Sequence, residues 1–178
     1  MLKAEYDYIV VGSGSAGAAV AARLSEDPGL SVLLLEAGPR DRHPFQLMPL
    51  AFVKLASGHF GTWQYQSEPE PQLHGRQLAI PRGRTLGGTS SINAMVAIRG
   101  HRRDYDRWSG LGLRGWSYAE VLPYFKRLET SWRGAGEFHG DKGPVHVSLM
   151  EGRDLLWEPL LKAAEAAGIP FCEDANGR

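Results

Sequence analysis

A glycine-rich turn between an apolar run and an alanine-rich segment constrains the fold of this chain more than any other feature. Residues 6–11 are apolar, rich in β-branched side chains and bounded by glycine, which is typical of a buried parallel strand. The turn at residues 12–17 has the GxGxxG spacing, and residues 18–24 predict a helix directly after it. Residues 31–36 predict a second buried strand that ends in a carboxylate. This order of elements predicts a Rossmann-like α/β domain built on a parallel sheet.

Each glycine of this turn has a physical role in binding a dinucleotide. Gly12 permits the tight turn, Gly14 has no Cβ and lets a pyrophosphate approach the backbone, and Gly17 lets the helix pack on the sheet. The helix N-terminus offers unpaired N–H groups to the phosphates. Glu36 can accept hydrogen bonds from ribose hydroxyls, and its charge disfavours the 2′-phosphate of NADP. The pattern predicts a dinucleotide but does not separate FAD from NAD.

A second cluster of small and polar residues, at positions 83–100, favours a flavin. Gly87 and Gly88 let the backbone pass close to a flat ring without obstruction by a side chain. Hydroxyl and amide groups, from Thr89 to Asn93, suit phosphate, ribityl and ring heteroatoms. Serine and threonine after a Gly-Gly turn also suit a helix start, which would supply further free N–H groups.

Residues 83–100 resemble the first sequence motif of the glucose–methanol–choline (GMC) oxidoreductase family, and the match continues to Asp106 with the spacing intact. Residues 63–71 also resemble that family, and residues 104–125 are similar to its choline-dehydrogenase-like branch. The resemblance implies FAD, with Ser15, Ala16 and Glu36 at the ADP half and Thr89 with residues 93–96 at the flavin half. The expected cofactor-binding residues are Gly12, Gly14, Ser15, Ala16, Gly17, Glu36, Ala37, Leu86, Gly88, Thr89, Asn93, Ala94, Met95 and Val96.

One position bears on how the FAD is held. In some members of the family a histidine just before the asparagine is joined covalently to the flavin, and here that position is Ile92. An isoleucine side chain has no atom that can form such a bond. We therefore expect non-covalent FAD.

The same resemblance implies the reaction, which is oxidation of a primary alcohol to a carbonyl with FAD accepting the hydride. The electrons would pass to a quinone, a dye-like acceptor or oxygen, and we favour a dehydrogenase over an oxidase. GMC proteins carry a second motif and a C-terminal catalytic histidine, and neither occurs in these 178 residues. We therefore expect no catalytic residue here and a base beyond residue 178. The six histidines are expected to be surface or packing residues.

Three other functions are compatible with the sequence. They are a catalytically inactive, truncated FAD-binding module, an NAD-dependent dehydrogenase and a flavin-dependent lyase. A flavin absorbance spectrum would separate FAD from NAD. Turnover with an artificial electron acceptor would separate an active chain from an inactive module.

The second half of the chain predicts supporting structure and the start of another domain. We expect residues 1–142 to be the N-terminal part of the FAD-binding domain and residues 143–178 to begin an incomplete substrate domain. Residues 143–149 alternate like a strand, and the family resemblance assigns this strand to an antiparallel sheet.

Two helices are expected in this half. Ser117 and Glu120 form a capping-box pattern that opens the first, and Pro123 is expected to kink it or to restrict its first turns. Residues 154–167 predict the second, which ends at Gly168.

Composition and charge narrow the partners and the compartment. Twenty basic residues balance twenty acidic ones, so no charge excess argues for nucleic acid. The single cysteine, Cys172, excludes an internal disulfide and a multi-cysteine metal site, and we expect no metal. No segment has the pattern of a secretory signal or of a transmembrane helix. We expect a cytoplasmic protein without a transmembrane segment, with peripheral membrane association as the alternative.

Overall fold

The computed structural model describes residues 5–58, 60–149 and 156–177, which form two compact units. The first unit is Met1–Val96 and the second is Ala97–Arg178. The boundary expected between cofactor and substrate domains, at residues 142 and 143, lies inside the second unit. That functional boundary stays a prediction.

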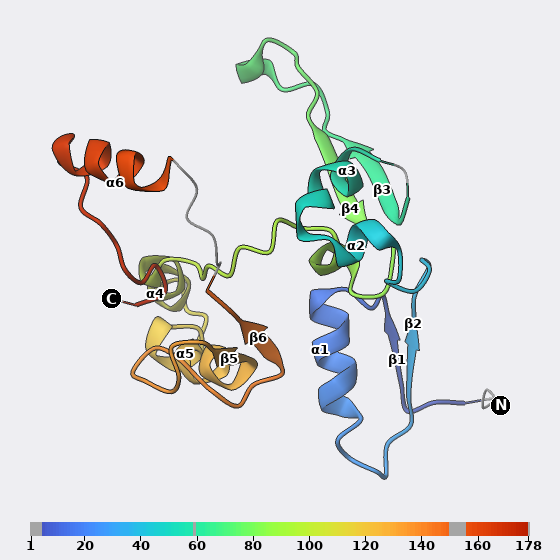
Figure 1. Ribbon diagram of the computed structural model, residues 1–178. Coiled ribbons are helices and arrows are strands. Elements are labelled where there is room, and N and C mark those ends of the chain that lie inside the picture. The colour runs from blue at the N-terminus through green and yellow to red at the C-terminus, as the bar shows by residue number, and fades with distance from the viewer. Residues whose placement is uncertain (1–4, 59, 150–155, 178) are drawn as a thin grey trace. The chain divides into compact units, whose positions relative to one another are not determined.

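The first unit begins with the predicted strand–turn–helix–strand order (Figure 1). Strand β1 (Tyr8–Val11) pairs in parallel with β2 (Val32–Leu35), from Tyr8 opposite Val32 to Val11 opposite Leu35. Helix α1 (Ser15–Leu24) lies alongside both strands. It begins earlier than the alanine run because Gly14, in an extended conformation, is its N-cap. The predicted α/β fold with a parallel sheet is confirmed.

The prediction that these strands are buried is wrong for the part of the chain that the structure describes. Ile9 is 57% exposed and Val11 is 81% exposed. Among the described residues β1 and β2 form a two-stranded sheet, and α1 is the helix that packs on it. Two strands with one helix leave apolar surface uncovered, because burial of a parallel strand needs neighbours on both faces.

A helical segment and a hairpin complete the first unit. Strand β3 (Thr62–Gln66) pairs antiparallel with β4 (Ala79–Gly83), and helix α3 (Phe52–Ser57) contacts β4. Helix α2 (Pro44–Leu47) precedes α3, with a 3₁₀ turn at Pro49–Ala51 between them. A further 3₁₀ turn lies at Pro71–Leu73.

The helix start expected after the second pair of glycines is a single 3₁₀ turn, Gly88–Ser91, that does not continue as an α-helix. Thr85 and Leu86, just before this turn, are hydrogen-bonded to Pro39, which follows β2. Thr85 is fully buried, and its Oγ1 donates to the carbonyl of Pro39 at 2.9 Å. The N–H of Leu86 donates to the same carbonyl at 3.0 Å. These bonds bring the second turn up to the sheet.

The second unit contains three helices and a pair of short strands within its described residues. Helix α4 (Arg102–Gly110) packs against α5 (Tyr118–Leu128), and Tyr105 of α4 meets Phe125 of α5 edge to face. The predicted capping box of α5 is confirmed, since Glu120 Oε2 accepts from the backbone N–H of Ser117 at 3.1 Å. The hydrogen bonds from the hydroxyl and backbone N–H of Ser117 lower the pKa of Glu120. Pro123 lies inside α5 without ending it.

The strand expected near residue 145 forms and pairs in parallel within the described residues, and the antiparallel sheet expected of the substrate domain stays a prediction. Strand β6 (Val145–Val147) pairs in parallel with β5 (Glu129–Ser131), which directly follows α5. The loop between them folds back along β5, since the N–H of Gly143 donates to the carbonyl of Glu129 at 3.0 Å. The chain therefore re-enters the sheet in the same direction, and within the described residues β6 does not begin an antiparallel sheet.

Helix α6 (Trp157–Ala166) confirms the expected end at Gly168. Gly168 has a φ of +76°, and its N–H donates to the carbonyl of Glu165. Ile169 N–H bonds to the carbonyl of Ala164, which completes a Schellman-type cap. Pro159 lies in the first turn, where its missing N–H leaves no helical bond unmade. The expected start at residue 154 lies outside the described residues.

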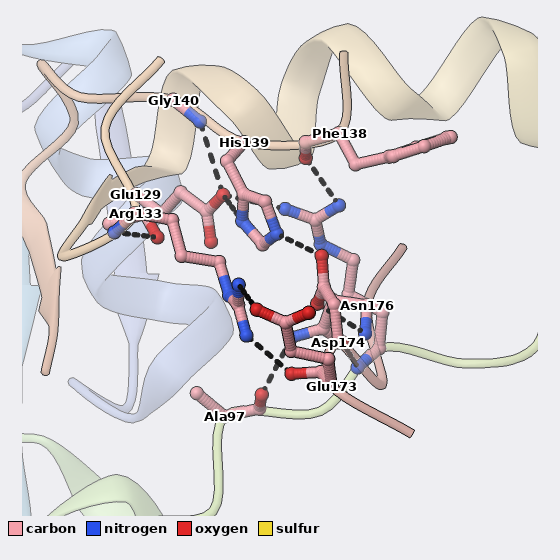
Figure 2. Close-up of polar contacts among 11 residues, drawn as sticks. Ala97, Glu129, Arg133, Phe138, His139, Gly140, Glu173, Asp174 and Asn176 are labelled. Carbon is pink, nitrogen blue, oxygen red and sulfur yellow. Dashed lines mark hydrogen bonds and ion pairs between the residues drawn. The ribbon is translucent and has the colours of Figure 1, made fainter. Parts of the chain in front are cut away.

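A buried polar network holds the second unit together (Figure 2). Glu129 accepts a hydrogen bond from Arg99 at 2.8 Å, and both side chains are 9% exposed. The same Oε1 atom lies 2.8 Å from Nδ1 of His139 and accepts from the N–H of Gly140 at 3.1 Å. Arg99 also donates to the carbonyl of Phe138 at 2.7 Å. One carboxylate thus joins the end of α5, the loop after β5 and the start of the unit.

The network extends to the last described residues. Nε2 of His139 lies 2.8 Å from Oδ2 of Asp174, and Asn176 donates from Nδ2 to the carbonyl of Ala97 at 2.8 Å. Partial burial raises the pKa of Asp174, but the His139 and Asn176 hydrogen bonds and the charges of His139 and Arg133 outweigh it. The net pKa is lowered, so Asp174 is ionised where it meets the imidazole.

Candidate cofactor site

The two glycine turns of the first unit meet. Gly14 and Gly87 form an isolated parallel bridge, and the N–H of Gly87 donates to the carbonyl of Ser13 at 3.0 Å. Gly88 has a φ of +56°, and a Cβ on it would lie 2.7 Å from Cα of Gly14. Real Cβ atoms do not approach backbone so closely, so this crossing requires glycine. Segments about seventy residues apart in the sequence therefore build one site.

The third glycine of the first turn is required for a related reason. A Cβ on Gly17 would lie 1.9 Å from the carbonyl oxygen of Gly12 and 3.4 Å from a methyl group of Val10. The first turn of α1 therefore packs directly on the glycine turn and on β1. Gly12 itself has a φ of +93°, which L side chains rarely adopt. Both glycines behave as the spacing predicts.

A cavity of about 670 Å³ lies where the turns meet. Its volume is in the range of small-molecule and cofactor sites. Nine of the fourteen expected cofactor-binding residues line it, namely Gly12, Gly14, Ser15, Ala16, Gly17, Glu36, Ala37, Gly88 and Thr89. Its other lining residues, which are not among those fourteen, are Val11, Leu35, Trp63 and Gly83.

The remaining expected residues lie outside the lining of this cavity; they are Leu86, Asn93, Ala94, Met95 and Val96. The carbonyl of Leu86 accepts from Ser91 Oγ at 2.7 Å, so the backbone of Leu86 stabilises the 3₁₀ turn. Asn93 Oδ1 accepts from the N–H of Met95, which has a φ of +59°. Met95 and Val96 are 55% and 74% exposed. Their expected contact with the flavin half stays a prediction.

Glu36 ties the first turn to the end of β2. Its Oε2 accepts from both the N–H and the hydroxyl of Ser13 at 2.9 Å, and its Oε1 accepts from the N–H of Gly38 at 2.8 Å. Partial burial raises the pKa of Glu36, but these hydrogen bonds outweigh it and the net pKa is lowered. The backbone N–H of Ala37 also lowers the pKa of this carboxylate.

These hydrogen bonds give a pH-dependent prediction. Glu36→Gln should lower the melting temperature near neutral pH, because its amide NH₂ would face a donor that now faces carboxylate oxygen. A lowered folded pKa contributes stability above the ordinary value of 4.5, and that contribution is lost as pH falls through the folded pKa. The difference in melting temperature between wild type and variant should therefore narrow below pH 4.5.

Thermal unfolding of both proteins across this pH range measures the effect. Glu137→Gln is the control, because Glu137 is an exposed carboxylate in the second unit. It should change the melting temperature little at any pH. A Glu36→Gln difference that stays constant as the pH falls would contradict the role of the ionised carboxylate.

Comparison with known proteins identifies the family. A model of the N-terminal part of the GMC oxidoreductases matches residues 6–178. The chain belongs to the GMC oxidoreductase family. The resemblance deduced from residues 83–100 is thereby confirmed.

Individual GMC relatives match nearly all of this chain. An oxygen-dependent choline dehydrogenase of Rhizobium rhizogenes is 48% identical over 171 residues, which cover 96% of this chain and 31% of that protein. The crystal structure of pyridoxine 4-oxidase from Mesorbium loti matches with a TM-score of 0.90 and 37% identity, over 97% of this chain and 34% of that one. An FAD-dependent oxidoreductase from Chaetomium thermophilum matches with a TM-score of 0.83 and 32% identity, over 97% and 31% of the two chains. The chain thus spans about a third of the length of these relatives.

Ile92 has a packing role. It is 5% exposed and lines a small cavity of about 70 Å³ together with Phe45, Phe52 and Leu55. The apolar side chain is therefore part of the core between the second turn and α3.

The described residues hold neither a metal-binding cluster nor a membrane-spanning helix. No three of their histidine, cysteine, aspartate or glutamate side chains are arranged to hold a metal ion. His139 instead lies between Glu129 and Asp174 as part of the network of Figure 2. Over residues 5–58, 60–149 and 156–177, no helix is long and apolar enough to cross a bilayer.

Proposed function

We propose that this chain supplies the FAD-binding part of a GMC enzyme that oxidises a primary alcohol to a carbonyl. The observation that carries the proposal is the cavity formed where two glycine turns meet beside Glu36. FAD is the dinucleotide named for one structural relative, and choline and pyridoxine are alcohols named for two others. When bound, FAD would supply the hydride acceptor.

The residues of the cavity fit such a cofactor. The first N–H groups of α1 lack intrahelical acceptors and carry the positive end of the helix dipole, which suits the pyrophosphate. Gly14 and Gly88 line the cavity without side chains, so their backbone is open to the pyrophosphate. Glu36 would face the ribose hydroxyls, and the bonds from Ser13 and Gly38 hold its carboxylate in place. We assign no proton transfer to this chain and propose that the catalytic base lies outside these residues.

The same proposal extends to the substrate and the electron acceptor. We propose a primary alcohol as substrate, a dehydrogenase in preference to an oxidase, and a quinone, dye-like acceptor or oxygen as electron acceptor. We further propose that residues 1–178 alone do not turn over an alcohol. Turnover by this chain with an artificial electron acceptor would contradict the last point.

Absorbance spectroscopy of the purified protein at its full natural length tests the cofactor. Two visible flavin bands, with FAD released on heating and identified by chromatography, would support the proposal. Release of NAD without flavin would favour the NAD-dependent alternative.

Non-covalent attachment gives a separate prediction. Because Ile92 replaces the histidine used for linkage, acid precipitation should leave a colourless pellet and release all the flavin into the supernatant. Absorbance of both fractions measures this, with a protein that carries a covalently bound flavin precipitated in parallel as control. A pellet that stays yellow would contradict the prediction.

A further inference from the structure

We propose that the indole of Trp63 forms an aromatic wall of the cofactor cavity and packs against the flavin half of the bound FAD. The inference rests on the proposed function and adds a cofactor contact to it. Trp63 lines the cavity together with Gly88 and Thr89, and it is 40% exposed. A large aromatic side chain left open to a concave site is a frequent means of binding a flat ring.

The hairpin places Trp63 on the side of the cavity that belongs to the second glycine turn. Trp63 on β3 lies opposite Arg82, one residue from Gly83, and the N–H of Gly83 donates to Thr89 Oγ1 at 3.1 Å. Glu36, where the ADP ribose is proposed to bind, comes instead from the end of β2. Since the pyrophosphate is proposed to lie at the N-terminus of α1 between them, the half that reaches Trp63 is the flavin half.

The ring of Trp63 is fixed by its own neighbours. The guanidinium of Arg84 lies 4.6 Å from the centre of the ring, and Tyr65, two residues along the strand, stacks with it at 6.3 Å. Neither Arg84 nor Tyr65 lines the cavity. These contacts limit the rotation of the indole before a ligand arrives, so little conformational entropy is lost when a ring packs on it.

Binding measurements on the full-length protein, stripped of cofactor, test this role. Trp63→Ala should weaken FAD binding about tenfold, in the range found when a stacking aromatic is removed. It should leave ADP binding unchanged within about twofold, because ADP lacks the half that Trp63 contacts. Trp63→Phe keeps an aromatic face and should recover most of the FAD affinity.

Trp132→Ala is the matched control. Trp132 is 48% exposed with the Arg133 guanidinium 4.5 Å from its ring centre, but it lies in the second unit and does not line the cavity. Its removal should leave FAD affinity unchanged. Unchanged FAD affinity in Trp63→Ala, or equal weakening of FAD and ADP, would overturn the assignment. Wild-type protein that binds no FAD would instead overturn the proposed function.

Discussion

Gly88→Ala should abolish FAD binding and lower the free energy of unfolding by about 2–5 kcal/mol. Two costs add. A left-handed φ of +56° costs an alanine roughly 1–2 kcal/mol. Its Cβ would also lie 2.7 Å from Cα of Gly14, and overpacking of this kind costs typically about 1–3 kcal/mol.

The loss of FAD has a geometric reason. The atoms that would meet are both backbone, so no side chain can rotate to relieve the contact. The bridge between Gly14 and Gly87 must open, which separates the two turns that build the cavity. Denaturant unfolding of the full-length apoprotein and the flavin content of the purified variant measure the two effects.

Gly75→Ala separates the two costs. Gly75 lies in the same unit with a φ of +75°, but no atom would lie within 4 Å of an added Cβ. This variant should therefore show only the conformational cost and should keep its FAD. Equal destabilisation by Gly75→Ala and Gly88→Ala would mean that the crossing of the turns contributes nothing.

Local chemistry made the first turn predictable from sequence. Gly12, Gly14 and Gly17 lie within six residues, and their spacing alone determines which backbone conformations the turn can adopt. The capping box at Ser117 and the end of α6 at Gly168 were predictable for the same reason. Each depends on residues within one helical turn.

Features that depend on distant partners were not predictable in this way. The exposure of Val11 depends on which elements cover the sheet, and the parallel pairing of β6 depends on the path of the loop after β5. Trp63 reaches the cavity only because the hairpin brings it beside Gly83 and Thr89. A tryptophan in a strand has no sequence signal that distinguishes a cavity wall from ordinary packing. His139 likewise meets Asp174 across thirty-five positions of chain.

The buried network of the second unit gives the other large expected effect. Glu129→Gln should lower the free energy of unfolding by about 3–5 kcal/mol, which is typical when one partner of a buried ion pair is removed. Glutamine has nearly the shape of glutamate but no charge. Arg99, 9% exposed, would keep its positive charge without the carboxylate that now lies 2.8 Å away. An uncompensated buried charge is far more costly than the loss of one hydrogen bond.

The loss should spread beyond the pair, because Oε1 of Glu129 is shared. The same atom lies 2.8 Å from His139 Nδ1 and accepts from the N–H of Gly140. An amide in its place cannot serve all three partners, so the His139 ring and its contact with Asp174 should loosen as well. Hydrogen exchange of the segment 173–177 should therefore rise in Glu129→Gln, in addition to the fall in stability measured by denaturant.

Glu26→Gln is the matched control for this charge. Glu26 pairs with Arg23 on the surface, where the two side chains are 63% and 53% exposed. An exposed pair contributes about 0–1 kcal/mol, so this variant should unfold almost as wild type does. A similar small loss in Glu129→Gln would show that solvent or local rearrangement compensates Arg99. A large loss confined to Glu129→Gln, with exchange raised at 173–177, would show that one buried carboxylate joins the two ends of the second unit.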